Sequence, residues 1–181
     1  EAVGGNPEIT TPIAVPLTLI SGAVDIHDDI IDRSTEKRGK PTVYGKFGED
    51  IALLAGDALL FKGFTLLSTA SEKFSPEKVT SMANIIKNAF YELGDAEALE
   101  VGLRKRLDVT LEEFLNVARK KAANVEAYTR IGAILGGATE AEIDALSRYG
   151  TTLGMLLVMQ DEYLDMLETE EFLHRLEYEC L

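Results

Sequence analysis

The sequence predicts an all-α protein of six or seven long helices. Three observations support this: apolar residues recur at helical spacing, recognisable helix starts separate the segments, and no stretch is a convincing strand. The 181 residues suffice for one domain with a sizeable core. We therefore expect a single helical domain over residues 1–181.

The first predicted helix runs from Thr11-Pro12 to about Arg33. Threonine is a common N-cap, and proline is favoured at the first helical position. Pro16 lies inside this helix and should remove a backbone hydrogen bond or bend it. Residues 1–8 resemble the end of a helix followed by a turn, so we expect that both ends of a larger fold are missing.

A polar connection over residues 33–46 leads to a second helix. That helix runs from Asp50 to about Thr69, and it is so apolar that we expect burial on most faces. Ser75-Pro76-Glu77 starts a third helix, whose apolar positions continue to Leu93.

Two capping boxes start the helices that follow. In residues 110–113 and again in residues 139–142, a threonine precedes a glutamate by three positions. The first box predicts one helix ending at Gly136-Gly137, and the second predicts a helix ending near Leu167. A last amphipathic segment covers residues 170–179.

Charge and composition limit the classes of partner. The chain has 18 basic and 31 acidic residues and a net charge of −13, which argues against nucleic acid but permits a phosphorylated small molecule. No apolar run reaches the roughly 18 residues of a membrane span, and no leader is visible, so neither a span nor a signal peptide is expected. One cysteine, Cys180, fits a reducing compartment, and we expect a cytoplasmic protein.

The first helix ends in an acidic cluster, His27-Asp28-Asp29-Ile30-Ile31-Asp32. On a helix Asp28 and Asp32 lie one turn apart, where like charges repel, and carboxylates beside apolar surface lose solvation. A hard divalent cation such as Mg²⁺ would compensate these charges. The alternative is a solvated acidic face. The apolar turns before the cluster favour the metal.

A second acidic cluster repeats the spacing at the end of a later helix. Asp161 and Glu162 are followed by two apolar positions and Asp165. Two helices that present such clusters to each other could hold metal ions against a diphosphate. The metal ions would act as Lewis acids on the leaving group.

Several motifs resemble the polyprenyl synthetases, also called trans-isoprenyl diphosphate synthases. These motifs are Ile26-His27-Asp28-Asp29-Ile30-Ile31-Asp32, Lys37-Arg38-Gly39-Lys40-Pro41-Thr42-Val43, Lys46-Phe47-Gly48 and Leu53-Leu54-Ala55-Gly56-Asp57. The resemblance spans about residues 1–165. It implies a bundle of long antiparallel helices around a central apolar cavity, usually as a homodimer. It also implies a Mg²⁺-dependent enzyme that condenses an allylic diphosphate with isopentenyl diphosphate.

The resemblance also assigns roles to residues. Asp28, Asp29 and Asp32 resemble the first metal-binding motif, and Asp161, Glu162 and Asp165 the second. Lys37 and Arg38 would serve the allylic and isopentenyl diphosphates, and Lys121 the allylic diphosphate. Ala23 and Val24 would set product length; neither is a bulky aromatic residue, which implies a product longer than farnesyl. Without the resemblance, Lys121 would be read as a solvated lysine.

The sequence departs from the family pattern at several positions. Lys37 stands where arginine is usual, Glu162 where aspartate is usual, Val158 where glutamine is usual and Ala122 where threonine is usual, and Asp25 is an additional acid. The usual Gly-Gly-Lys segment is absent before Glu1, and no family-like loop follows Asp165.

Two functions remain open. One is a prenyltransferase that makes an all-trans polyprenyl diphosphate, geranylgeranyl or longer. The other is a catalytically weakened homologue acting as a binding or regulatory subunit of a heteromeric synthase. A terpene cyclase is disfavoured, because cyclases seldom keep the run from Gly39 to Val43.

Overall fold

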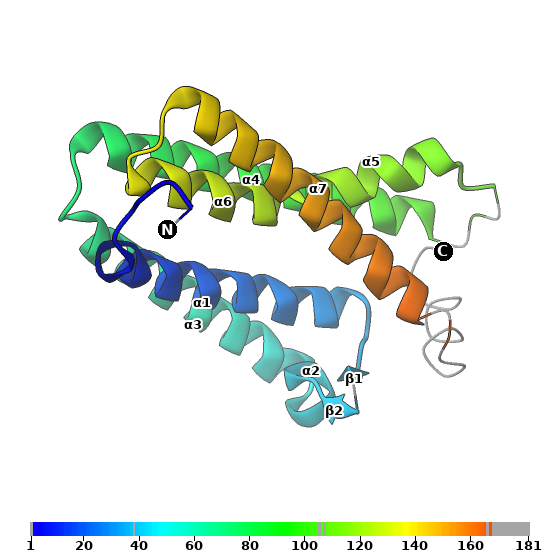
Figure 1. Cartoon of the computed structure of the whole chain (residues 1–181). Helices are drawn as coiled ribbons and strands as arrows, with labels where there is room; N and C mark the ends of the chain where they lie inside the picture. Colours follow the sequence, from blue (N-terminus) through cyan, green and yellow to red (C-terminus); the bar gives the residue numbers. More distant parts are fainter. Residues whose placement is uncertain (1, 38, 105, 107, 166, 168–181) are drawn as a thin grey trace. The chain divides into compact units, whose positions relative to one another are not determined.

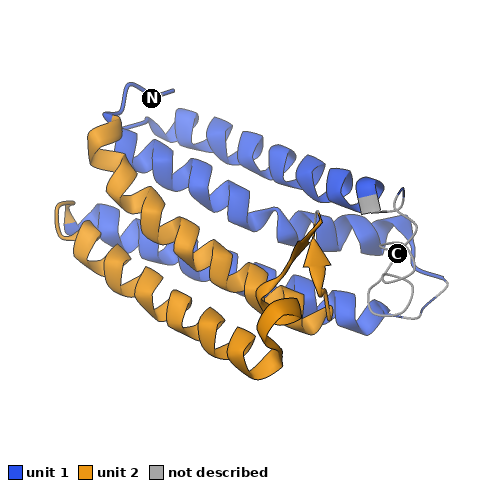
Figure 2. Ribbon diagram, turned by 90° about the horizontal axis from the view of Figure 1, so that it is seen from below, with its two compact units in different colours: residues 1–6, 76–181 blue, residues 7–75 orange. Residues whose placement is uncertain are grey.

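The computed structural model confirms the all-α class (Figure 1). It describes residues 2–37, 39–104, 106, 108–165 and 167, with the backbone alone for Asp165. The chain divides into two compact units (Figure 2). Unit 2 is Pro7–Ser75, and unit 1 joins Glu1–Asn6 to Pro76–Leu181. Whether these units form a single domain remains a prediction.

Unit 2 consists of two long helices with a small structured connection. These elements are α1 (Pro7–Ile31), β1 (Glu36–Lys37), β2 (Lys40–Pro41), α2 (Val43–Phe47) and α3 (Glu49–Ser71). Helices α1 and α3 pack along each other. The end of α1 and the hairpin that follows it form the part of unit 2 that bears on function.

Helix α1 begins earlier than predicted. It starts at Pro7, which takes the favoured first position, so both Pro12 and Pro16 lie inside the helix. Proline has a helical φ but donates no hydrogen bond, which costs stability. Ile13, Pro16 and Leu17 are buried, and their packing offsets this cost.

The connection after α1 is more ordered than the predicted polar loop. Strands β1 and β2 pair antiparallel, with Lys37 opposite Lys40, although the sequence showed no convincing strand. Gly39 has a φ of 71°, a left-handed conformation that glycine adopts without steric cost in a tight turn. These two-residue strands are too short to leave a periodic signal.

The described residues of unit 1 form four long helices. They are α4 (Pro76–Leu103), α5 (Leu111–Lys121), α6 (Ala123–Gly136) and α7 (Glu140–Asp165). Helices α5 and α6 each pack against α4 and against α7. Their buried core includes Met82, Ile85, Ile86, Ala89, Ala127 and Ile131.

Both predicted capping boxes are present. The Thr110 N–H donates to the Glu113 carboxylate at 2.8 Å, and the Glu113 N–H donates to Thr110 Oγ1 at 3.2 Å. Thr139 and Glu142 form the same pair of bonds at 2.8 and 3.4 Å. The predicted starts of α5 and α7 are therefore confirmed, and α4 also begins at the predicted Pro76.

The single helix predicted from Thr110 to Gly136 is instead two helices that meet at Ala122. Ala122 is fully buried. A Cβ atom added to Gly154 of α7 would lie 2.8 Å from both Cα and Cβ of Ala122, so the two backbones approach closely. This packing accounts for small residues at both positions, including the alanine found in place of the usual threonine.

Helix α3 is less buried than predicted. Five of its large apolar side chains are between 40% and 75% exposed: Ile51, Leu53, Leu54, Phe61 and Phe64. Helices α1 and α3 are also long and apolar enough to cross a membrane, contrary to the sequence prediction. Core helices can have the same length and composition, so these two helices alone are weak evidence for a membrane.

Candidate active site

The first acidic cluster lies where α1 ends. The Arg33 N–H donates to the Ile30 carbonyl at 3.3 Å, and the Ser34 N–H donates to the Asp29 carbonyl at 2.9 Å. Arg33 has a φ of 57°, so this is a Schellman-type helix end with arginine in place of the usual glycine. The motif places Asp28, Asp29 and Asp32 in and just beyond the last turn of α1.

This position is electrostatically unfavourable for carboxylates. Asp29 is 7% exposed and Asp32 is 6% exposed, and both lie at the negative end of the helix dipole. Burial raises the pKa of Asp29, the nearby ammonium group of Lys37 lowers it, and the charge of Asp28 raises it again. The cluster therefore has a physical need for a cation.

Lys37 supplies a positive charge from strand β1. Its Nζ lies 2.8 Å from Asp29 Oδ1 and 3.5 Å from Asp28 Oδ2. Burial disfavours the charged form of Lys37, but Asp28, Asp29 and Asp32 together raise its pKa. Lys37 thus stays charged and is held against the first cluster.

Thr42 holds the segment that carries Lys37. Its hydroxyl donates to the Ser34 carbonyl at 2.6 Å, and its N–H donates to the Thr35 carbonyl at 3.0 Å. The same hydroxyl accepts the Gly45 N–H at 2.9 Å and caps α2. Arg38, the second predicted diphosphate ligand, lies outside the described residues.

The first cluster has the donor set for a hard divalent cation. Carboxylate oxygens are the ligands that Mg²⁺ prefers, and the buried Asp29 gains from a positive partner. Among the described side chains, no group of three or more His, Cys, Asp or Glu residues is already arranged to hold a metal. The ammonium group of Lys37 instead contacts two of the carboxylates.

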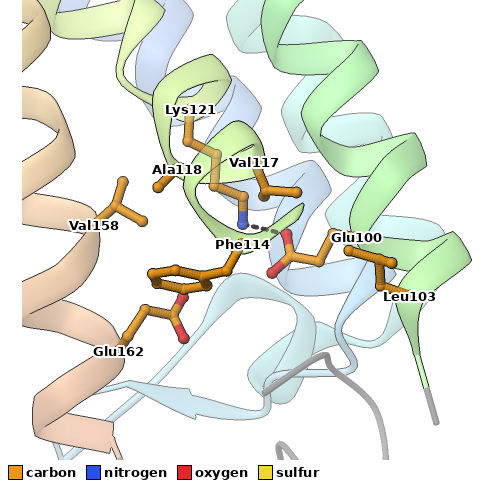
Figure 3. Close-up of a pocket in the computed structure, with 8 residues that line it drawn as sticks. All are labelled: Glu100, Leu103, Phe114, Val117, Ala118, Lys121, Val158 and Glu162. Carbon is orange, nitrogen blue, oxygen red and sulfur yellow. Dashed lines mark ion pairs between the residues drawn. The ribbon is translucent and has the colours of Figure 1, made fainter. Parts of the chain in front are cut away.

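The second cluster lies at the end of α7 in unit 1. Asp161 is exposed, whereas Glu162 is half-buried and lines a pocket (Figure 3). Asp165 is the last residue of α7, and its side chain is outside the described part. The metal-binding role of all three remains a prediction.

Lys121 lines the same pocket as Glu162. The other lining residues are Glu100, Leu103, Phe114, Val117, Ala118 and Val158. The ammonium group of Lys121 forms a close ion pair with Glu100 (Figure 3) and also lies 3.6 Å from a carboxylate oxygen of Glu97. Lys121 is therefore not simply a solvated lysine. Val158, which replaces the usual glutamine, makes this wall of the pocket apolar.

Sequence reasoning did not identify Glu97 or Glu100. They lie three residues apart on α4, beyond the last apolar position used to define that helix. A glutamate pair on a helix normally reads as solvated surface. Only the 6% exposure of Glu100 and its pairing with Lys121 distinguish it.

The two residues predicted to set product length lie on α1. Ala23 is fully buried and Val24 is half-buried. Neither has a bulky side chain. Their role in product length remains a prediction.

The chain belongs to the polyprenyl synthetase family. A family model described as polyprenyl synthetase matches residues 2–176. A short chain isoprenyl diphosphate synthase from Methanothermobacter thermautotrophicus is 38% identical over 174 residues, which cover 96% of this chain and 53% of the relative. The chain thus spans about half the length of the curated relatives it matches.

Solved structures agree with this assignment. Geranylgeranyl pyrophosphate synthetase from Pyrococcus horikoshii is 37% identical with a TM-score of 0.84, over 91% of this chain and 50% of that one. A polyprenyl synthase from Caulobacter crescentus, complexed with calcium and isoprenyl diphosphate, is 25% identical with a TM-score of 0.81, over 98% and 51% of the two chains.

Proposed function

We propose that the protein is a Mg²⁺-dependent prenyltransferase. It condenses an allylic diphosphate with isopentenyl diphosphate and yields an all-trans polyprenyl diphosphate of geranylgeranyl length or longer. Membership of the polyprenyl synthetase family supports this reaction class, as do relatives named for geranylgeranyl and short-chain synthases. The structural observation that carries it is the buried acidic cluster at the end of α1, held beside Lys37.

The predicted site residues would bind either the metal or the diphosphate. Asp28, Asp29 and Asp32 at the end of α1 would hold Mg²⁺ in unit 2, and Asp161, Glu162 and Asp165 at the end of α7 would hold Mg²⁺ in unit 1. When bound, the metal supplies Lewis-acid stabilisation of the leaving diphosphate. Lys37 in unit 2 and Lys121 in unit 1 would each offer positive charge to a diphosphate, with Arg38 as a further diphosphate ligand.

The reaction begins as the allylic C–O bond breaks and its electron pair leaves with the diphosphate. The π electrons of isopentenyl diphosphate then form a C–C bond to the allylic cation, and loss of a proton restores a double bond. Preorganised cations that stabilise the departing charge are expected to supply most of the rate enhancement. Apolar walls, such as Val158 and Phe114 beside Lys121, would keep water from the cation.

Product length and assembly are parts of the same proposal. Small residues at Ala23 and Val24 are compatible with a product longer than farnesyl. Exposed apolar side chains on α3, including Leu54 and Phe61, suit burial in a homodimer. We place the protein in the cytoplasm, because one cysteine in 181 residues fits a reducing compartment.

The test is an elongation assay with the full-length protein. Labelled isopentenyl diphosphate, an allylic diphosphate and Mg²⁺ should yield a labelled product of geranylgeranyl length or longer. Addition of a chelator should abolish it. No product alone, but product after a partner chain is added, would instead identify the regulatory subunit of a heteromeric synthase.

A further inference from the structure

Glu100 is a buried acid beside Lys121 in the pocket of unit 1. It is 6% exposed and shares the pocket lining with apolar Leu103 and Val117. A carboxylate in such surroundings loses much of its hydration, so it is costly unless a cation pairs with it. Lys121 is that cation, and Figure 3 shows its side chain directed at Glu100.

The neighbouring lysine shows that this direction is specific. Lys120 pairs with Glu92 at 2.6 Å and Asp95 at 3.4 Å, and those two carboxylates are 49% and 70% exposed. Adjacent lysines on α5 thus reach different acids of α4, one pair exposed and one buried. The ion pair with buried Glu100 therefore holds the Lys121 side chain in the pocket.

We propose that Glu100 is a positioning residue for Lys121, an inference that rests on the proposed function. An ammonium group has three N–H donors. The ion pair with Glu100 directs this group into the pocket, where a diphosphate oxygen would accept from it. Glu97 at 3.6 Å is a more distant partner and contributes less.

This arrangement has two separable consequences. The negative charge of Glu100 repels an incoming diphosphate, whereas its ion pair, made at the full length of the glutamate side chain, orients Lys121 for the departing diphosphate. Loss of the charge should therefore strengthen binding of the diphosphate while it slows turnover. General damage to the fold would instead weaken both.

The experiment measures binding of inorganic pyrophosphate by calorimetry, with Mg²⁺ and the full chain, and turnover in the elongation assay. For Glu100→Gln we expect about fivefold tighter pyrophosphate binding and about tenfold lower kcat. Glu100→Asp keeps the charge but shortens the reach, so its affinity should stay within about twofold of wild type while kcat falls about fivefold. Glu92→Gln, which removes the exposed partner of Lys120 on the same helix, is the matched control and should change each quantity by less than about twofold.

Several outcomes would overturn the proposal. They are pyrophosphate binding by folded Glu100→Gln that is unchanged or weaker, equal effects of Glu92→Gln and Glu100→Gln, and pyrophosphate affinity that does not depend on Lys121. If Glu100→Gln does not fold, normal turnover by Glu100→Asp would have the same meaning. The binding measurement needs no product, so tighter pyrophosphate binding without elongation would sustain the role of Glu100 and reject the proposed function.

Discussion

The two units each pair a lysine with acidic side chains, but the balance between them is reversed. In unit 2 three carboxylates gather at the end of α1, and Lys37 forms ion pairs with two of them, Asp28 and Asp29. In unit 1 Lys121 faces the pocket, and Glu97 and Glu100 compensate it. The first site offers oxygen ligands to a cation, whereas the second offers a cation to an anion.

The difference shows how a site for a charged ligand is kept folded without that ligand. In each unit the internal counter-charge lowers the cost of burying ionised groups. In unit 2 the counter-charge comes from a hairpin that Thr42 holds in place. In unit 1 it comes from the body of a long helix. We therefore expect the two sites to respond differently to loss of charge.

The largest expected effect is on turnover, from the first cluster. Asp29→Asn keeps the shape of the side chain but removes a charged ligand, so kcat should fall about 10³-fold. The elongation assay measures this at saturating Mg²⁺. Asp25→Asn, one turn earlier on the same helix, is the control and should remain within about threefold of wild type. Comparable losses for the two variants would show that the cluster acts only through its net charge.

An intermediate effect is expected on stability, from the second site. Lys121→Met leaves Glu100 buried without its ion-pair partner, so the free energy of unfolding should fall by about 2 kcal/mol. Lys120→Met removes an ion pair with exposed acids and should cost less than about 1 kcal/mol. Urea denaturation measures both. Equal costs would mean that burial of Glu100 does not distinguish the two lysines.

The smallest expected effect is a pH-dependent gain in unit 2. Burial, followed by the charge of Asp28, raises the pKa of Asp25 above its ordinary value. The folded state thus holds the proton more tightly than the unfolded state, and stability present at low pH is lost as pH rises through the folded-state pKa. Asp25→Asn removes this loss. It should be more stable than wild type by about 0.5 kcal/mol at pH 7, after allowance for screening by water.

That gain should vanish near pH 3, where wild-type Asp25 is also protonated. Urea denaturation at the two pH values measures it. Asp25→Glu retains the charge and should behave like wild type. A gain of the same size at both pH values would contradict an electrostatic origin.

Much of the fold could be predicted, because the relevant signals are local. Thr110 and Thr139 each pair with a glutamate three residues ahead, so their capping boxes are legible in the sequence. The predicted start of α1 was wrong, because the Thr11-Pro12 pair lies inside the helix but has the residues typical of a helix start. The predicted burial of α3 on most faces was also wrong, because apolar composition does not show how many other elements cover a helix.

The candidate site was predictable in part for the same reason. The acidic clusters are short motifs, but the break at Ala122 depends on the approach of Gly154 from another helix. Similarly, Glu100 becomes a buried partner of Lys121 only when α4 packs against α5.

The sequence by itself determined where most helices start, how the acids are spaced and which family the motifs resemble. The tertiary structure decided which charge meets which: Lys37 with Asp29, Lys120 with Glu92, and Lys121 with Glu100. The physical reason is how far apart in the sequence the interacting residues lie. Caps and acid spacing depend on neighbours within about one helical turn, whereas the strength of an ion pair depends on burial that packing between distant segments creates.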